Sequence, residues 1–273
     1  MDFQVLVATM HQSDFSILKR MNIKSNCIIA NQTNIDEISI KETDRHKCFM
    51  VSTSTRGVGL NRNIALSKAT ADILLFADDD VVYNDDVEHN VLTAFDETPQ
   101  ADVIIFGIDI LKNGKVVEER RCRNARLHVW NSMKYGTYRI AVKKESIEKL
   151  GIRFNENFGG GCKFGSGEDS IFIKQCFDKG LKVYSNEYSL GSCSKDSSSW
   201  FSGCNEKYFY DKGVLFRILF PKTAYLTSLY FAIYCKKETD INVFKRIKLI
   251  YSGIWHGKKL VPYEESYEKS SDR

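Results

Sequence analysis

The chain has 273 residues and a mass of 31.3 kDa, with 43% hydrophobic and 27% charged residues and a net charge of +4 at pH 7. These values are typical of a folded globular protein, and they exclude collagen-like chains, disordered chains and an obligate nucleic-acid-binding protein. The eight cysteines are at least eleven positions apart, which excludes a CxxC redox pair, a zinc-ligand spacing and a dense disulfide scaffold. No secretory signal is visible, so we expect reduced thiols and a cytoplasmic protein.

Short apolar runs alternate with amphipathic segments along the first part of the chain. They predict strands at residues 3–8, 27–30, 48–51, 73–76 and 103–106, helices at 13–21, 60–69 and 87–95, and an acidic loop between 31 and 47. This alternation is typical of βαβ units, so the predicted fold class is α/β with a mostly parallel sheet flanked by helices. Asn113-Gly114 between two apolar runs predicts a hairpin, which would make the second part of the sheet mixed.

The composition changes after residue 212. Between 213 and 260, nine Lys or Arg stand against two acids, a local charge of +7, and aromatic and aliphatic residues lie among them. The apolar stretch at 224–235 is shorter than the roughly twenty residues that span a bilayer. We therefore predict an α/β domain at 1–212, a helical segment at 213–260 and a polar tail at 261–273. A basic, aromatic segment of this kind lies at the membrane interface beside anionic lipids, or else it packs on the first domain with a solvated basic face.

Three acids, Asp78-Asp79-Asp80, directly follow the apolar strand predicted at 73–76. Neighbouring carboxylates repel one another unless a cation neutralises them, and open α/β sheets bind ligands at the carboxyl ends of their strands. Oxygen ligands so placed suit Mg²⁺ or Mn²⁺, with water and phosphate oxygens at the other coordination positions. The alternative is an acidic loop that caps the next helix. Because three acids follow a wholly apolar strand, we favour the metal–phosphate site.

A second acidic pair, Glu168-Asp169, follows the glycine-containing stretch Gly165-Ser166-Gly167. Apolar residues at helical spacing come next and stop at Gly180, a predicted C-cap. Both acids are therefore predicted in the first turn of a helix, where they also complement the helix dipole. Alone this pattern is weak. Beside a metal–phosphate site, it supplies a carboxylate that takes a proton from an incoming hydroxyl group.

The helix predicted at 60–69 opens with a glycine-containing loop that includes Arg56 and continues as Asn61-Arg62-Asn63. Arginine side chains and backbone amides at a helix N-terminus favour an anion. The segment has neither the GK[ST] of a P-loop nor a GxGxxG pattern. A plain loop-to-helix junction with exposed arginines explains this segment equally well.

The order of these segments resembles glycosyltransferase family 2, whose catalytic domain has the GT-A fold. Asn61-Arg62-Asn63 corresponds to the family's Arg-Asn segment, Asp78-Asp79-Asp80 to its DxD cluster and Glu168-Asp169 to its ED pair. Residues 154–169 and 200–209 look like those of bacterial members that build surface polysaccharides. The resemblance covers residues 1–212 and implies a Rossmann-like, mixed and mostly parallel sheet flanked by helices.

The resemblance implies a metal-dependent, inverting enzyme that uses a nucleotide-sugar. Asp80 with Asp78 would hold the divalent cation, Mn²⁺ or Mg²⁺, on the donor diphosphate, and Asp79 would contact the ribose or the sugar. Asp169, or alternatively Glu168, would deprotonate the acceptor hydroxyl. Further donor contacts are implied for Ala8, Asn31, Gln32, Arg56, Asn61, Arg62 and Gly167.

Two segments depart from the family pattern. Ala8-Thr9-Met10 stands in place of a proline-containing segment, and Ala30-Asn31-Gln32-Thr33 in place of an acidic Asp-Asp-Gly-Ser loop. An amide also hydrogen-bonds a uracil edge, so we expect Asn31 and Gln32 to read the base of a UDP-sugar. Because the acidic residues of that loop are missing, the sequence does not determine which nucleotide the donor contains.

The expected acceptor is a hydroxyl of a lipid-linked glycan in bacterial capsule, O-antigen or exopolysaccharide synthesis. The protein would then lie at the cytoplasmic face of the inner membrane, without a nucleic-acid partner. Trp130 and Trp200 are candidates for stacking on a sugar ring, although large aromatics are core residues more often. A nucleotidyltransferase and a non-catalytic nucleotide-sugar-binding protein remain alternatives, and the sequence does not indicate an oligomeric state.

Overall fold

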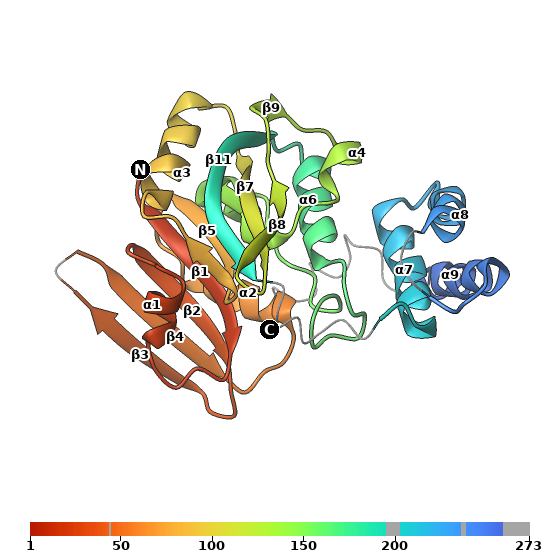
Figure 1. Cartoon of the computed structure of the whole chain (residues 1–273), viewed down its shortest axis with the longest axis horizontal. Coiled ribbons are helices and arrows are strands. Elements are labelled where there is room, and N and C mark those ends of the chain that lie inside the picture. The colour runs from red at the N-terminus through yellow and green to blue at the C-terminus, as the bar shows by residue number, and fades with distance from the viewer. Residues whose placement is uncertain (44, 195–202, 236–238, 259–273) are drawn as a thin grey trace. The chain divides into compact units, whose positions relative to one another are not determined.

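The computed structural model describes residues 1–43, 45–194, 203–235 and 239–258 (Figure 1). The chain divides into two compact units. The larger comprises Met1–Cys162 and Glu168–Ser198, and the smaller comprises Lys163–Gly167 and the chain from Ser199 onward. Trp200 and the polar tail predicted at 261–273 lie outside the described residues.

A mixed sheet forms the centre of the larger unit, with the strand order β3-β4-β2-β1-β5-β10-β7-β11-β6, and with β8 beside β7 and β9 beside β11. The strands are β1 (Phe3–Met10), β2 (Asn26–Gln32), β3 (Glu37–Glu42), β4 (Lys47–Thr53), β5 (Ile73–Asp78), β6 (Val81–Tyr83), β7 (Val103–Lys112), β8 (Lys115–Arg120), β9 (Ala125–Arg126), β10 (Ile140–Lys143) and β11 (Val183–Ser194). Strands β4, β2, β1 and β5 run parallel, as do β7 and β11, whereas β10 is antiparallel to both of its neighbours. The predicted α/β fold with a mixed sheet is confirmed.

Helices cover both faces of this sheet (Figure 1). One face packs against α1 (Ser16–Arg20) and α3 (Val87–Glu97), and the other against α2 (Val58–Lys68), α5 (Lys144–Lys149) and α6 (Glu168–Asp178). Successive side chains of a strand point to opposite faces, so Val5 and Val7 belong to the first core and Leu6 to the second. Burial on both faces explains why the central strands are continuous apolar runs in the sequence.

The prediction of an acidic loop between 31 and 47 is wrong in part, because β3 lies there as an antiparallel edge strand beside β4. Every residue of β3 is exposed or half-buried, and Ile38 and Ile40 are exposed. Ile38 and Ile40 alternate with Glu37, Ser39 and Lys41. This period of two is typical of a strand, so the sequence contains a signal that the loop prediction did not use. The predicted hairpin is confirmed: β7 and β8 pair antiparallel, with φ of 50° at Asn113 and 71° at Gly114.

The smaller unit contains α7 (Glu206–Leu219), α8 (Ala224–Tyr234) and α9 (Val243–Gly257). The helix α7 extends across residue 212, and the division between the units precedes it. The axes of α7 and α9 come close at two glycines. A Cβ on Gly213 would lie 2.0 Å from the carbonyl oxygen of Ile250, and one on Gly253 would lie 2.1 Å from that of Tyr210. Within the described residues, no helix is both long and apolar enough to span a membrane.

This close helix crossing predicts the effect of a single added methyl group. We expect Gly253→Ala to lower the free energy of unfolding by about 1–3 kcal/mol, because the two backbones would have to separate. On intrinsic helix propensity alone, the same change would stabilise the helix by about 1 kcal/mol. Thermal unfolding followed by circular dichroism gives the sign. The exposed neighbour Ser252 provides the control, Ser252→Ala, and a stabilised Gly253→Ala variant would contradict the close crossing.

Candidate active site

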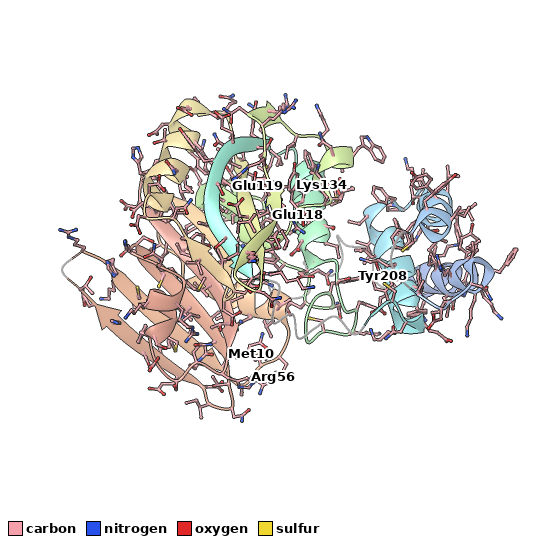
Figure 2. All side chains as sticks on the ribbon, in the orientation of Figure 1. Met10, Arg56, Glu118, Glu119, Lys134 and Tyr208 are labelled. Carbon is pink, nitrogen blue, oxygen red and sulfur yellow. The ribbon has the colours of Figure 1, made fainter. Side chains whose placement is uncertain are left out.

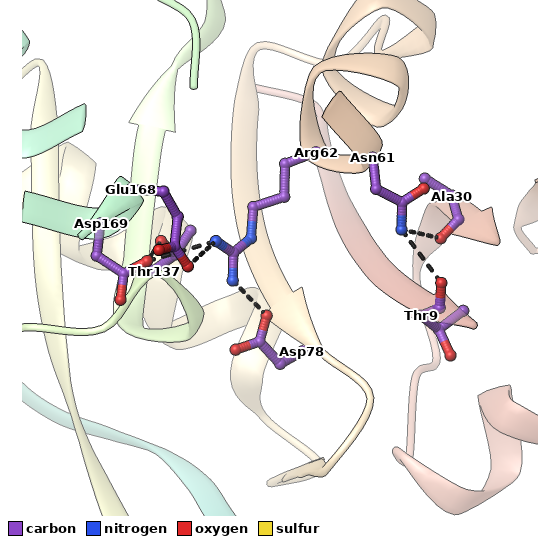
Figure 3. A network of polar contacts seen from close by, with 8 residues as sticks. All are labelled: Thr9, Ala30, Asn61, Arg62, Asp78, Thr137, Glu168 and Asp169. Carbon is purple, nitrogen blue, oxygen red and sulfur yellow. Dashed lines mark hydrogen bonds and ion pairs between the residues drawn. The ribbon is translucent and has the colours of Figure 1, made fainter. Parts of the chain in front are cut away.

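The predicted motifs meet at the carboxyl end of the parallel strands in the larger unit (Figure 3). Asp78 is the last residue of β5 and pairs in register with Ala8 of β1. Arg62 lies in the second turn of α2, and Glu168 and Asp169 begin α6. Residues separated by more than a hundred positions are therefore brought into direct contact by the sheet and the two helices that cover one of its faces.

Arg62 is the centre of this group. It is only 4% exposed, and its Nη2 lies 2.7 Å from Asp78 Oδ1, while its Nη1 lies 3.2 Å from Glu168 Oε1 and 3.4 Å from Asp169 Oδ1. Its guanidinium also lies over the ring of Phe154, 5.4 Å from the centroid. Burial by itself lowers the pKa of Arg62, but the three carboxylates, Asp78 first, more than reverse this and raise it. Arg62 therefore remains a cation that neutralises part of the acidic cluster.

Asp169 is the more accessible of the two acids at the start of α6. Its side chain is 31% exposed and that of Glu168 is 11% exposed. Burial, followed by the charge of Glu168, raises the pKa of Asp169 to about 7, against the opposing effects of Arg62 and of a hydrogen bond from the Thr137 hydroxyl. Glu168 is packed against Gly159, where a Cβ would lie 2.8 Å from its Cδ. Of the two acids, Asp169 is therefore the one that a molecule from solution can reach more easily.

Asp80 has a buried oxygen that fits a cation. Its Oδ1 has no hydrogen-bond partner among the described residues, and the Cys193 thiol donates a hydrogen bond to its side chain. Burial, together with the charge of Asp78, raises the pKa of Asp80 to about 6. A buried carboxylate oxygen without a partner is unusual in a native protein and is the kind of ligand that Mg²⁺ or Mn²⁺ takes.

A complete metal site made by protein alone is absent from the part of the chain that the structure describes, since no three His, Cys, Asp or Glu residues converge on one point. Asp78 and Asp80 are two carboxylates, so a cation held by them would take its other ligands from water and phosphate oxygens. Asp79 is exposed, and it accepts a hydrogen bond from Thr9 Oγ1 at 2.5 Å. The three consecutive acids therefore have three different surroundings.

The amides predicted near the nucleotide join the ends of the strands to one another. Asn31 is fully buried, and its Nδ2 donates to Gln12 O at 2.8 Å while its Oδ1 accepts from Gln12 N at 3.0 Å. Gln32 Nε2 donates to Gly57 O at 3.1 Å. Asn61 Nδ2 donates to the carbonyls of Thr9 and Ala30, at 3.1 and 2.8 Å (Figure 3). Reading of a base by Asn31 would require it to exchange these bonds.

Arg56 and Gly167, which are also predicted donor contacts, bond to or pack against residues other than the acids. Arg56 is exposed (Figure 2). Its guanidinium donates hydrogen bonds to the carbonyls of Thr33, Ser54 and Thr55, so it connects two loops. Gly167 belongs to the smaller unit, where a Cβ would lie 2.6 Å from Leu215. In that unit α7 fixes the loop that leads into Glu168, because Asp211 accepts hydrogen bonds from Gly165 N at 2.9 Å and from Lys207 at 2.5 Å.

Sequence reasoning missed three residues that contact the acids: Thr9, Thr137 and Cys193. Thr9 lies in the Ala8-Thr9-Met10 segment that departs from the family pattern, and the other two lie in no motif. Each reaches its acid from another element, as when β11 pairs Cys193 with Val81 of β6. Trp130 is 75% exposed on α4 (Val129–Ser132), so a core position for it is wrong. The chain beside it contacts the start of α6, since Ser170 Oγ donates to Met133 O at 3.2 Å.

The model of Glycosyl transferase family 2 matches residues 32–150, which include Arg62 and all three acids that follow β5. This stretch of the chain is similar to family 2 glycosyltransferases. The resemblance predicted from the motifs is confirmed, and this match supports glycosyltransferase activity.

Solved structures of S. aureus TarS have the same fold as this chain. TarS 1-349 superposes with a TM-score of 0.58 at 13% identity, covering 93% of this chain and 71% of TarS 1-349. TarS 1-349 in complex with UDP-GlcNAc gives 0.58 at 15% identity, covering 97% and 78%. Among curated proteins, no significant match was found. At these identities the TarS likeness shows the GT-A-like fold alone.

Proposed function

We propose that the protein is a metal-dependent, inverting glycosyltransferase that moves a sugar from a nucleotide-sugar to a hydroxyl group. The observation that supports this most directly is the convergence of Asp78, Glu168 and Asp169 on the buried Arg62, next to the unpartnered oxygen of Asp80. The match to the family 2 model and the UDP-GlcNAc bound by TarS support a UDP-sugar as the first donor to test.

Each acid has a separate role in this proposal. Asp169, with Glu168 as the alternative, accepts the proton of the acceptor hydroxyl. The hydroxyl oxygen bonds to the anomeric carbon from the side opposite the diphosphate, and the bond from that carbon to the diphosphate breaks, which inverts the configuration. Asp78 and Asp80 would hold Mg²⁺ or Mn²⁺. A cation bound there would neutralise the negative charge on the departing diphosphate.

Arg62 keeps these acids in position and limits their mutual repulsion. Without its charge, Asp169 would hold its proton more tightly, since Arg62 is one of two groups that lower the pKa of that carboxyl. A base with a pKa near the working pH combines a large deprotonated fraction with a useful basicity. Burial, which raises the pKa of Asp169, and the ion pair with Arg62, which lowers it, therefore give this carboxyl a pKa suited to proton transfer.

We further propose that the acceptor is a lipid-linked glycan of bacterial surface-polysaccharide synthesis, and that the protein works at the cytoplasmic face of the membrane. The exposed ring of Trp130, in a segment that contacts the start of α6, supports stacking on an acceptor sugar. The apolar and basic helices of the smaller unit support a membrane location.

Calorimetric titration of UDP with and without Mn²⁺ tests the donor site. We expect binding that needs the metal and that weakens at least about tenfold in Asp80→Asn, by analogy with lost metal-site partners. Asp85→Asn is the matched control, because Asp85 is exposed and pairs with Lys24. Binding without metal would contradict the cation site. Failure of UDP, GDP and dTDP to bind under either condition would overturn the proposal.

Product analysis separates the competing functions. Release of a nucleoside diphosphate supports sugar transfer, whereas release of pyrophosphate would indicate a nucleotidyltransferase. Metal-dependent nucleotide binding without turnover on any donor and acceptor would indicate a non-catalytic binding protein.

A further inference from the structure

In the smaller unit, α8 exposes its large apolar side chains and buries its small ones. Its buried stripe consists of Ala224, Ser228 and Ala232. Its exposed stripe consists of Leu226, Tyr230, Ile233 and Tyr234, which are 71%, 67%, 48% and 63% exposed. A helix at a protein–water surface has the opposite distribution. Contiguous exposed apolar side chains of this kind mark an interaction surface.

The helix α9 extends this surface with aromatic and basic groups. Trp255 is 61% exposed, and the ammonium of Lys258 lies 5.0 Å from its ring and 5.7 Å from that of Tyr225 in α8. The rings of Tyr225 and Tyr251 are 5.0 Å apart. These contacts connect the start of α8 to the end of α9. Lys248 is exposed two helical turns before Trp255, on the same side of α9. We call the surface formed by Leu226, Tyr230, Ile233, Tyr234, Trp255, Lys248 and Lys258 the α8–α9 face.

The positive charge of the α8–α9 face indicates what kind of partner it binds. Neither α8 nor α9 contains an Asp or Glu residue, whereas α9 contains Lys245, Arg246 and Lys248 and is followed by Lys258. Lys245 already pairs with Glu206 at 2.5 Å, but Lys248 and Lys258 are exposed. A second copy of the same face would bring like charges together. A partner that is apolar inside and negative at its surface complements both properties, and an anionic bilayer is such a partner.

We propose that the α8–α9 face binds the headgroup region of a bilayer that contains anionic lipids. Tyrosine and tryptophan rings are favoured at that depth, and lysines beside them contact lipid phosphates. The biological purpose rests on the proposed function, because a lipid-linked acceptor would be presented at the same surface. The binding itself does not depend on the chemistry at Asp169.

Sedimentation of the full chain with lipid vesicles tests this proposal. We expect binding to vesicles of phosphatidylcholine mixed with phosphatidylglycerol, weaker binding to phosphatidylcholine alone, and loss of the difference in high salt. Lys248→Gln and Lys258→Gln should each lower the partition coefficient about fivefold. Leu226→Ser with Tyr230→Ser should lower it at least about tenfold, because both side chains would enter the interface.

The matched controls lie in the larger unit: Lys149→Gln for charge and Val117→Ser for an exposed apolar residue, 57% exposed on β8. Equal losses in these controls, or no binding of the wild-type chain to anionic vesicles, would overturn the proposal. Light scattering that shows self-association, removed by Leu226→Ser with Tyr230→Ser and unaccompanied by vesicle binding, would instead assign the face to a second copy. Circular dichroism confirms that each variant is folded.

The failure of this inference is distinguishable from the failure of the proposed function. UDP binding is measured on the same preparations. Vesicle binding without binding of UDP, GDP or dTDP would support the α8–α9 face and overturn the transferase proposal. UDP binding that persists in a chain without vesicle binding would overturn the α8–α9 face and the membrane location proposed from the same helices, but not the donor site.

Discussion

Asp169→Asn should lower kcat by about 10²–10⁴-fold, the range contributed by a positioned general base, and should leave UDP binding unchanged. Asparagine has the same shape as aspartate, and its Oδ1 can still accept the hydrogen bond that Thr137 donates. It cannot take a proton from the acceptor. Release of UDP from donor and acceptor, measured beside calorimetric titration of UDP, separates the lost chemistry from lost binding.

Glu168→Gln is the control that decides between the two neighbouring acids. Glu168 is more buried than Asp169 and shares the same Arg62 nitrogen, so we expect its substitution to reduce activity less than that of Asp169. An equal or larger loss in Glu168→Gln, with Asp169→Asn active, would assign the base to Glu168.

The pH dependence of kcat/KM gives an independent signature of the same base. Because burial raises the pKa of Asp169 to about 7, the carboxyl is protonated and inactive below that pH and becomes active as pH rises through it. Thr137→Val removes a donor that lowers this pKa, so the rising limb should move to higher pH. A limb that stays in place would show that another group titrates.

The positions of the acids could be predicted because each follows from neighbours in the sequence. The apolar run that ends at Asp78 fixes the three acids at the end of a buried strand, and the helical spacing after Asp169 fixes the first turn of α6. The register between strands has no such local signal. That is why the contact of Cys193 with Asp80 and the placement of Asn61 between β1 and β2 could not be predicted.

The helical unit shows a second limit of sequence reasoning. Ala224 to Tyr234 is apolar on nearly all sides, with Thr227 and Ser228 as its only polar residues. The sequence therefore does not tell which side of this helix is buried. The packing of α7 and α9 decides this, because the core there is formed by residues such as Phe209, Ile250 and Ile254 together with the small side chains of α8. The large residues of α8 are left outside, and only the structure reveals the α8–α9 face.

Arg62→Met should destabilise the protein by about 3–5 kcal/mol, the loss expected when one partner of a buried ion pair is removed. Methionine fills much of the same space beside Phe154, but it leaves Asp78, Glu168 and Asp169 without the cation that they share. Urea unfolding measures the change. The deficit should shrink as pH falls, because carboxyls with raised pKa values in the folded variant bind protons there and lose their repulsion.

Arg121→Met is the matched control for this change. Arg121 also contacts two acids, Asp109 at 3.2 Å and Glu119 (Figure 2) at 3.4 Å. Its side chain, however, is 47% exposed. Exposed pairs contribute about 0–1 kcal/mol, so the two arginines differ in burial more than in partners. Equal losses in Arg62→Met and Arg121→Met would mean that water already screens the cluster. Burial is the main cause of the raised pKa of Asp169. If water screens the cluster, that cause is absent, and Asp169 would have to act as the base with the ordinary pKa of an aspartate.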